Sequence, residues 1–571
     1  MFIKDLRKEF YDVLLEQRVL IMVNHDVDAL CSVKLITTLF KYDKIRFTLI
    51  PITETDEMVK VFQTYQQSVK YFLLLNCGAQ IDIAEVLEPD DHHVIFIADS
   101  HRPVDVYNVY RPDQVKLLMD EDDVEDVPDY NDVFREEDED DEEEDEDAPQ
   151  RSRSLEELER RHEKRLWEEK RRKVLLSYSE YTYYGESISW LFFKLAWTLS
   201  KDSNELLWLT IIGIFDLHIN ERITRKTFLG YVSQLKSHLK RLSQLKSGEN
   251  LFNAPNPSID DILDVPVSRR TFVSITHKKD LKVNLYRHWN LYESFQHTRL
   301  LSCKFKVWER TGICRFKEFL ADLGLPLSQC RNNFSAMDFD LRKNVLEWVE
   351  NLSEKYNLDG IVGDSFEAKH GFRHHFAVDD MVYGLNALLE SPCRELNLKE
   401  KFMKALEALS WSKIEVIMKG IELAQSQLKA ILKQVHDLIE LKAIETKGPY
   451  LYAMISHTQP DARLFRYPGC LYNLARFLLR AFLASSKKKK LMNLPLVLVV
   501  REVDDPDSCL AVGIPPAAED PTRNLFARLF VQTAHDLRVE VLPLLYDFNV
   551  VRFRFEQMNQ ILDRLVTSFS N

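Results

Sequence analysis

The sequence predicts an α/β protein with a parallel-sheet domain, a helical region and a second α/β domain. Short apolar runs alternate with amphipathic stretches near both ends of the chain, whereas the middle third has a mainly helical pattern. The chain has 571 residues, of which 45% are hydrophobic, and this apolar content is enough for several domains with their own cores. Disorder along the whole chain is therefore excluded.

The N-terminal region contains four short apolar runs: Val19–Asn24, Arg46–Ile50, Tyr71–Leu75 and Val94–Ala98. Amphipathic stretches such as Ala29–Phe40 and Asp56–Gln67 separate them. Strands that are buried on both faces have continuously apolar sequences, so this rhythm predicts a parallel sheet with crossover helices. Such a sheet binds ligands at the carboxyl ends of its strands.

A charged insert interrupts this region. Between Asp120 and Asp147 there are 20 acidic residues and one Arg, and from Arg151 to Lys173 the net charge is +4. The chain as a whole carries −14, so the remainder is close to neutral at +1. We expect the acidic tract to stay solvated, to meet only basic partners and to contribute little to thermal stability. The basic stretch, with acid-to-base pairs four residues apart, predicts a solvated helix.

The rest of the chain divides into three further stretches. Tyr181–Ile219 predicts buried helices that return to the first domain, and 220–390 is mainly helical, with a helix end at Gly324. One long helix is expected over Glu400–Leu441, followed by a second α/β domain. Its expected elements are strands at Tyr450–Ile455, Leu496–Arg501, Leu510–Ile514 and Val550–Phe555, and helices at Leu471–Leu483, Asn524–His535 and Gln557–Phe569. The predicted domains are 1–219, interrupted by 120–173, then 220–395 and 396–571.

Three features of the composition bear on location. The longest apolar runs, such as Leu494–Val500, fall well short of the roughly 20 residues of a membrane-spanning helix. The first residues alternate charged with apolar side chains and lack the apolar core of a signal peptide. Eight cysteines occur without a Cys-x-x-Cys pair, which argues against a disulfide framework or zinc site. We expect a soluble protein of the reduced cytosol or nucleus, without membrane contact.

Polar residues follow the apolar runs at the points where strands should end. These candidate residues are Asp26 and Asp28, then Asn76, then Asp99, Ser100 and His101, with Asp216 after a later apolar run. Parallel strands bring such ends to one edge of a sheet, and Asp and His are ligands of Mg²⁺ and Mn²⁺. The alternative is structural, because a single Asp after a strand is most often the N-cap of the next helix.

This set of residues resembles the motifs of the DHH phosphoesterase superfamily, which includes the RecJ exonucleases. The resemblance implies a DHH-type α/β domain and a C-terminal DHH-associated domain, but Asn76 stands where the family has an Asp and Ser100 where it has the first His. Two cations about 3.5–4 Å apart need bridging anions, and an amide removes one negative charge. We therefore expect a degenerate two-metal pocket with no cofactor. One metal held by Asp26, Asp28, Asp99, His101 and Asp216 remains an alternative.

Several longer segments resemble the cell division control protein 45 family, the eukaryotic RecJ-like branch of that superfamily. They are 75–79, 99–110, the acidic insert, 319–327, 370–376 with 390–392, and 512–516. The resemblance implies a non-catalytic subunit of the nuclear replicative helicase, the CMG assembly. It also implies that this subunit joins the Mcm hexamer to the GINS complex, binds single-stranded DNA and meets fork factors such as polymerases. The alternative function is an active, metal-dependent single-strand exonuclease of the RecJ type.

Two further stretches are candidates for contacts with nucleic acid. Lys487, Lys488, Lys489 and Lys490 could bind phosphates or act as a nuclear import signal, although such loops are more often simply solvated. Arg373 and His374 lie in an alternating Phe and His segment that suits a nucleic-acid strand. A half-buried strand and turn is the preferred interpretation of that segment.

Overall fold

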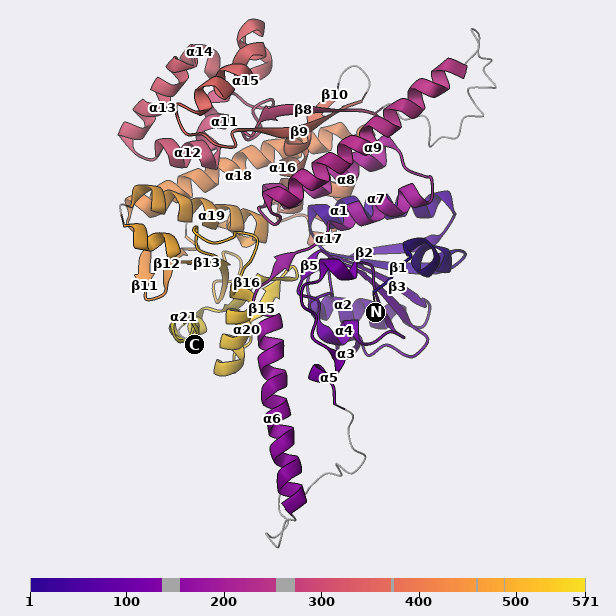
Figure 1. Ribbon diagram of the computed structural model, residues 1–571. Helices are drawn as coiled ribbons and strands as arrows, with labels where there is room; N and C mark the ends of the chain where they lie inside the picture. The colour runs from indigo at the N-terminus through magenta and orange to yellow at the C-terminus, as the bar shows by residue number, and fades with distance from the viewer. Residues whose placement is uncertain are drawn as a thin grey trace.

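The N-terminal region folds around a five-stranded, fully parallel sheet (Figure 1). The computed structural model describes residues 2–135, 155–252, 273–370, 374–458, 461–486 and 488–569. The strand order is β2-β1-β3-β4-β6, with β1 Arg18–Val23, β2 Arg46–Pro51, β3 Tyr71–Leu75, β4 Val94–Ala98 and β6 Val115–Leu117. The four predicted strands are confirmed. The sequence analysis missed β6, since three residues give too short a pattern.

Helices cover both faces of this sheet. They are α1 Val27–Tyr42, α2 Thr55–Tyr65, α3 Ile83–Leu87, α4 Val106–Val109, α7 Ile188–Thr198 and α8 Asn204–Ile219. Along β1, Val19 and Ile21 belong to the core cluster that contains α1, α7 and α8, whereas Leu20 and Met22 belong to the cluster that contains α2 and α3. Because alternate strand residues point to opposite faces, burial of both faces explains the continuous apolar runs.

The middle of the chain is less helical than predicted, because it contains an antiparallel sheet of order β10-β9-β8. The strands are β8 Val273–Leu281, β9 Val362–His370 and β10 His374–Ala377. Strand β8 is not predicted from the sequence, because its run of polar residues has no apolar strand pattern. Lys278 on β8 forms an ion pair of 2.7 Å with Glu367 on β9. Strands β9 and β10 confirm the strand part of the preferred interpretation of the Phe and His segment, and residues 371–373, where the turn was expected, lie outside the described ranges.

The remaining elements of this middle region are helices. They are α9 Arg225–Phe252, α11 Leu291–His297, α12 Arg299–Phe305, α13 Arg310–Asp322, α14 Leu327–Cys330, α15 Phe339–Ser353 and α16 Val378–Leu389. The predicted helix end lies between α13 and α14, where Gly324 has a φ of 70°. Such a left-handed conformation favours glycine.

The predicted long helix over 400–441 is wrong, because the chain forms two helices there. They are α17 Leu398–Ala408 and α18 Ile414–Glu440. Between them Trp411 stacks on His370 of β9 with ring centroids 5.0 Å apart. This tertiary contact overrides the local helical pattern. On α18, a Cβ added to Gly420 would lie 2.5 Å from the carbonyl oxygen of Gly384, so these glycines allow α16 and α18 to pack closely.

The C-terminal region contains a six-stranded mixed sheet of order β11-β12-β13-β14-β16-β15. Its strands are β11 Glu445–Lys447, β12 Tyr450–Ile455, β13 Leu496–Arg501, β14 Ser508–Ile514, β15 Leu542–Leu544 and β16 Asp547–Arg554, and its helices are α19 Pro468–Ser485, α20 Phe526–Leu537 and α21 Met558–Ser568. Only the β12–β13 pair is parallel. The predicted strands and helices are confirmed. The boundaries of the three predicted domains remain a proposal.

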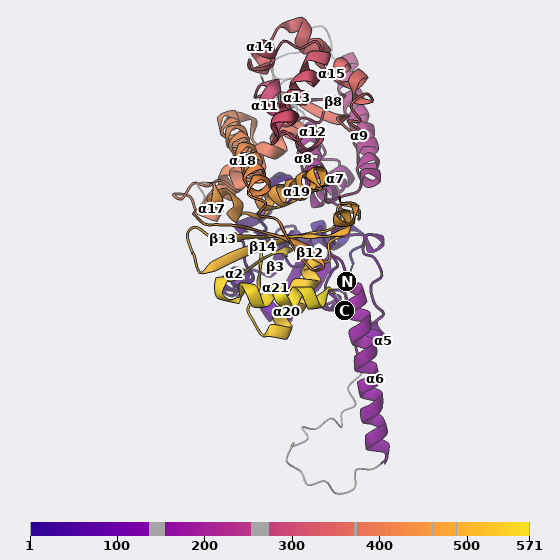
Figure 2. The same ribbon diagram turned by 90° about the vertical axis from the view of Figure 1, so that its left-hand side faces the viewer.

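The charged insert is partly docked on the body. Helix α6, Leu155–Tyr178, projects away from the rest of the molecule in both views (Figures 1 and 2). The expectation of a solvated acidic tract is wrong for its first part. Val133, the last residue of α5 Tyr130–Val133, is 2% exposed, and the Asp123 carboxylate accepts a 2.7 Å hydrogen bond from Arg102. Residues 136–147 lie outside the described ranges. Within those ranges, no helix is both long and apolar enough to cross a membrane.

Candidate functional site

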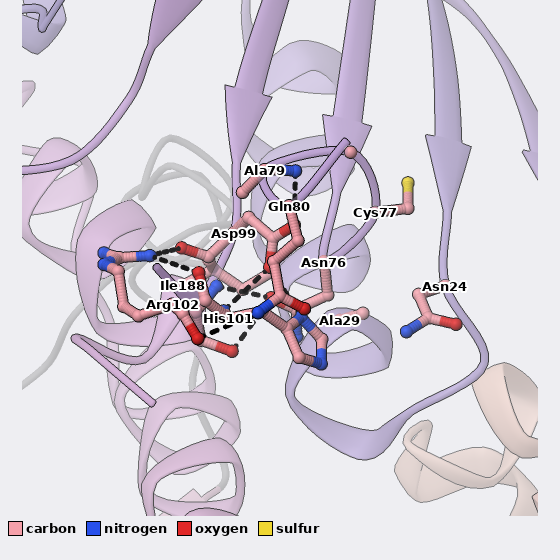
Figure 3. Close-up of polar contacts among 12 residues, drawn as sticks. Asn24, Ala29, Asn76, Cys77, Ala79, Gln80, Asp99, His101, Arg102 and Ile188 are labelled. Carbon is pink, nitrogen blue, oxygen red and sulfur yellow. Dashed lines mark hydrogen bonds and ion pairs between the residues drawn. The ribbon is translucent and has the colours of Figure 1, made fainter. Parts of the chain in front are cut away.

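The carboxyl ends of β1, β3 and β4 bring five polar residues to one edge of the N-terminal sheet. Three of them, Asn76, Asp99 and His101, are labelled in Figure 3. We call this set the polar edge: Asp26, Asn76, Asp99, Ser100 and His101. The three strands pair in register, so Val23, Leu75 and Ala98 end side by side. The parallel pairing therefore places these residues together, as the sequence predicts.

Asn76 joins two strand ends through its amide group. Its Nδ2 donates to both carboxylate oxygens of Asp26, at 3.1 and 3.2 Å. Its Oδ1 accepts from the backbone N and the Oγ of Ser100, at 2.9 and 3.1 Å. Asn76 has a φ of 51°, a left-handed conformation that Asn adopts more readily than most residues. A carboxylate at this position could accept from Ser100 but could not donate to Asp26.

Asp26 also has the structural role weighed in the sequence analysis. It is the N-cap of α1, and its Oδ1 accepts from the backbone N of Ala29 at 2.8 Å. Burial raises the pKa of Asp26 to about 7, against the lowering effect of this hydrogen bond, and the neighbouring Asp28 adds to the rise. The polar edge thus holds a carboxyl group that is costly to ionise.

Asp99 and His101 form a buried pair. His101 Nδ1 lies 2.7 Å from Asp99 Oδ1, and the carboxylate also accepts from the backbone N of His101 at 2.9 Å and of Ala79 at 3.0 Å. Burial alone would raise the pKa of Asp99, but His101 and these hydrogen bonds lower it. Burial would lower the pKa of His101, but Asp99 raises it. Each residue of the pair therefore favours the charged form of the other.

Asp28 points away from the other members of its motif. Its carboxylate is fully buried and accepts from Ser187 Oγ at 2.7 Å and from the backbone N of Ile188 and Ser189 at 3.0 and 3.2 Å. A Cβ added to Gly213 of α8 would lie 2.5 Å from its Oδ1, so α8 closes over it. Burial raises the pKa of Asp28 despite these bonds. Asp28 joins α1 to the start of α7 and is closed to solvent.

Asp216 lies on helix α8 and not at a strand end. Its carboxylate accepts from Nδ2 of Asn220 and of Asn386, each at 2.9 Å, and Arg222 lies 3.5 Å away. Burial raises its pKa, although Arg222 opposes the change. The described hydrogen bonds of Asp216 therefore link α8 to α16, while its neighbour Arg222 is also near enough to Asp26 to oppose the rise in the pKa of Asp26.

Arg102 is a residue of the site that the sequence analysis missed. Its side chain is 0% exposed, and its Nη1 donates to the carbonyl oxygens of Asp99 and His101, at 2.8 and 2.9 Å. Its Nη2 donates to Asp123, and a Cβ on Gly185 would lie 2.8 Å from that nitrogen. The partner carboxylate lies in the acidic tract, so no local pattern could have identified the pair.

The predicted lysine and histidine contacts lie elsewhere. Lys487, Arg373 and the side chain of Lys489 lie outside the described part of the chain. Lys488 and Lys490 are exposed on the segment after α19, and His374 is half-buried on β10, where it pairs with His370. The described contacts do not connect any of these residues to the polar edge.

The polar edge does not fit a pair of metal ions. Two-cation sites need anionic oxygens between the ions. Here both Asp26 oxygens face the N–H groups of Asn76, and Asp28 is enclosed by α7 and α8. A second group of potential ligands is Asp90, His92 and His93, but both ring nitrogens of His93 are already bonded, to Gln66 and Asp90. Hydrogen-bond donors of the chain itself therefore occupy the carboxylate oxygens of Asp26 and Asp28.

An arginine-lined cavity of about 110 Å³ lies between the end of α8, α19 and the segment after β14. Arg222 and Arg480 have carboxylate partners there, in Asp216 and Glu221. Arg476 donates to the carbonyl oxygen of Asn220. Burial lowers the pKa of Arg476, although Glu221 opposes the change. Among the described residues, the Arg476 guanidinium therefore makes no direct ion pair, although Glu221 acts on it at longer range.

The parallel N-terminal sheet, the polar edge and the mixed C-terminal sheet define an α/β protein built on two sheet regions, which confirms the predicted α/β fold class. The family model for CDC45 matches residues 19–149 and 121–568. The chain therefore belongs to the CDC45 family, which confirms the resemblance found in the sequence. This membership supports a role in DNA replication and favours a non-catalytic factor over a hydrolase.

Individual relatives match over nearly their full lengths. The human cell division control protein 45 homolog is 35% identical over 581 residues, covering 100% of both chains. Cell division control protein 45 of Saccharomyces cerevisiae is 24% identical, covering 95% of this chain and 94% of the yeast protein. The crystal structure of CDC45 from Entamoeba histolytica has a TM-score of 0.70, 21% identity and full coverage of both chains. The similarity thus extends through all parts of the fold.

Proposed function

We propose that this protein is a non-catalytic subunit of the replicative helicase in the nucleus. In this assembly it joins the Mcm hexamer to the GINS complex, binds single-stranded DNA and meets fork factors such as polymerases. Family membership supports the replication role, and the altered polar edge supports a role in holding partners instead of cleaving a substrate.

The Asn76 bridge is the observation that carries the non-catalytic proposal. Its amide donates to Asp26 and accepts from Ser100, so it ties two strand ends together with hydrogen bonds in the place of a bridging anion. Two-metal phosphoryl chemistry would require a carboxylate there to hold the cations together. The ancestral pocket is degenerate, and its residues now stabilise the sheet edge.

The arginine-lined cavity supports the proposal of DNA binding. Phosphate contacts come mainly from Arg and Lys, and Arg476 is available without first breaking an ion pair. We expect Arg476→Ala to lower the affinity for a fluorescent oligothymidylate and to reduce its salt dependence. Unchanged affinity would contradict a role of this cavity. Lys419→Ala, on the exposed face of α18, is the matched control.

A nuclease assay separates this proposal from the rival exonuclease. The rival uses Asp26, Asp99 and His101 of the polar edge, where a single metal would have to bind. The purified protein, incubated with single-stranded DNA and Mn²⁺, is expected to leave the DNA intact. Digestion that disappears in an Asp26→Asn, Asp28→Asn double variant would overturn the non-catalytic proposal.

Reconstitution tests the helicase role itself. We expect the chain to elute with purified Mcm hexamer and GINS as one complex in size-exclusion chromatography. We also expect unwinding of a forked DNA to require all three components. A chain that elutes alone, or unwinding that is the same without it, would contradict the proposal.

A further inference from the structure

A basic groove of about 710 Å³ lies where α17 and the segment before it meet parts of both sheet regions. Its cationic residues are Arg394, Lys399, Lys401 and Arg466, and its carboxylates are Glu57 and Asp504. Glu57 is on α2, and Asp504 follows β13. In Figure 2, α17 lies at the side of the molecule above α2 and β13. We call this the basic groove.

The charges of the basic groove are not balanced. Four cationic side chains face two carboxylates, which leaves a net charge of +2. Lys399 pairs with Glu57 at 2.7 Å. Arg394 and Arg466 share one carboxylate, that of Asp504, at 2.8 and 2.6 Å. The excess therefore comes from one unmatched guanidinium and from Lys401.

Lys401 is a buried cation whose partners are neutral. It is 4% exposed, and its Nζ donates to the carbonyl oxygen of Ser391 at 2.6 Å and lies 2.7 Å from the hydroxyl of Tyr467. No carboxylate among the described residues pairs with it. Removing an ammonium group from water is costly unless an anion or several hydrogen bonds compensate. Since Lys401 lines the groove, an anion bound there would supply the missing charge.

The two arginines can reach a ligand. Their side chains are 60% and 41% exposed, and each gives one hydrogen bond to Asp504. A guanidinium has five N–H donors, so most remain available to a second acceptor. Two guanidinium groups that converge on one point suit a phosphate group, which accepts several charge-assisted hydrogen bonds.

The surroundings favour a polypeptide over a nucleic-acid strand. Single-stranded nucleic acid is bound by aromatic faces on which bases stack. The aromatic ring of this groove, Tyr467, is 6% exposed, and the Arg466 guanidinium and the Lys401 ammonium lie 5.4 and 5.1 Å from its centroid. Half-buried Leu396 and Leu398 instead offer apolar contacts for side chains next to a phosphorylated residue.

We propose that the basic groove binds a phosphorylated serine or threonine side chain of a partner polypeptide. Such a side chain carries −1.5 to −2 charges at neutral pH, which matches the net +2 of the groove. Arg394 and Arg466 bind the phosphate oxygens, and the buried Lys401 adds a third positive charge to the lining of the groove. Asp504 competes with the ligand for both arginines, so it limits the affinity. This inference goes beyond the proposed function, because it assigns a phosphorylation-dependent contact to a surface away from the Asn76 bridge.

Fluorescence anisotropy tests the proposal with the full chain. The probe is a labelled, degenerate heptapeptide pool with a central phosphoserine, and the same pool with unmodified serine is the reference. We expect the phosphorylated pool to bind at least about tenfold more tightly. Arg394→Gln with Arg466→Gln should remove most of this difference, and both side chains are exposed enough for the variant to fold. Asp504→Asn should increase the affinity, because it frees both guanidinium groups.

Lys404→Gln, on the exposed face of α17, is the matched control and should leave binding unchanged. Equal binding of the two pools would overturn the proposal, as would loss of binding in Lys404→Gln as large as that in the arginine double variant. A 5′-phosphorylated oligothymidylate should not displace the phosphopeptide pool from the groove. Binding of the oligothymidylate that depends on Arg394 and Arg466, without binding of the pool, would assign the groove to nucleic acid and end the peptide proposal.

Discussion

The polar edge and the basic groove both concentrate charged side chains, but they use their hydrogen bonds differently. Asp99 of the polar edge and the neighbouring Asp28 are buried, and each carboxylate accepts three bonds from the chain itself. In the groove, Arg394 and Arg466 are exposed and each gives one bond to a shared carboxylate. Charged groups whose hydrogen-bonding capacity is used by the chain itself maintain the fold, whereas charged groups with unused donors can bind a ligand.

The largest expected effect comes from removing Arg102, the buried cation that contacts Asp99 and His101 of the polar edge. Arg102→Met leaves the carbonyl oxygens of Asp99 and His101 without their donor and Asp123 without its cation. We expect a loss of about 3–5 kcal/mol in the free energy of unfolding, measured by urea denaturation. Arg394→Ala in the groove should change stability by less than about 0.5 kcal/mol. Similar losses for both variants would remove the distinction between the two regions.

A second way to test the edge is to disturb the packing around Asp28. Gly213→Ala would place a Cβ 2.5 Å from the Asp28 carboxylate and 2.2 Å from Ser189 Oγ. We expect a loss of about 1–3 kcal/mol from overpacking, seen as a lower melting temperature. Gly230→Ala on α9, where the new Cβ meets nothing within 4 Å, is the control. It should stabilise the protein slightly through helix propensity, and a gain at Gly213 as well would show that α8 is not closed over Asp28.

The sequence predicts the polar edge well because the relevant signals are local. Each strand is a short apolar run, and its polar residues follow directly, so the parallel pairing is sufficient to bring Asp26, Asn76 and Asp99 together. Asp28 and Asp216 belong to the same motifs, but their partners are on α7 and α16. The direction in which a carboxylate points depends on such distant partners, and one sequence does not contain this information.

Other features escape sequence analysis for the same reason. Asp123 lies in a tract whose composition predicts a solvated chain, yet a buried arginine holds it. The break between α17 and α18 follows from the stacking of Trp411 on His370. The basic groove combines Arg394, Asp504 and Glu57 from segments far apart in the chain. Composition and periodicity describe local structure, whereas these features are tertiary.

Two substitutions test whether the polar edge can be converted into a metal site. Asn76→Asp with Ser100→His replaces the amide donor by a carboxylate that faces Asp26 and adds an imidazole. We expect the affinity for Mn²⁺ to rise at least about tenfold over the wild-type chain, measured by isothermal titration calorimetry. Asn332→Asp, at an exposed position, controls for the added charge. No gain over this control would mean that neighbouring side chains fill the space, and the edge would then be closed to ligands even with its anionic bridge restored.

The smallest expected effect is a change in the pH dependence of stability. Burial raises the folded-state pKa of Asp26 to about 7 from its usual 3.8, so the folded protein binds this proton more tightly than the unfolded chain. Stability attributable to Asp26 therefore falls as the pH rises from about 4 to 7. His101, whose pKa is also raised, loses its contribution in the same direction, so the comparison must be made between variants.

Asp26→Asn keeps an N-cap residue and should flatten the decline in unfolding free energy between pH 5 and pH 8 by an amount on the order of 1 kcal/mol. The exposed Asp359→Asn should follow the wild-type curve. If Asp26→Asn also follows it, Asp26 is solvated, and the polar edge resembles the groove more closely than its hydrogen bonds indicate.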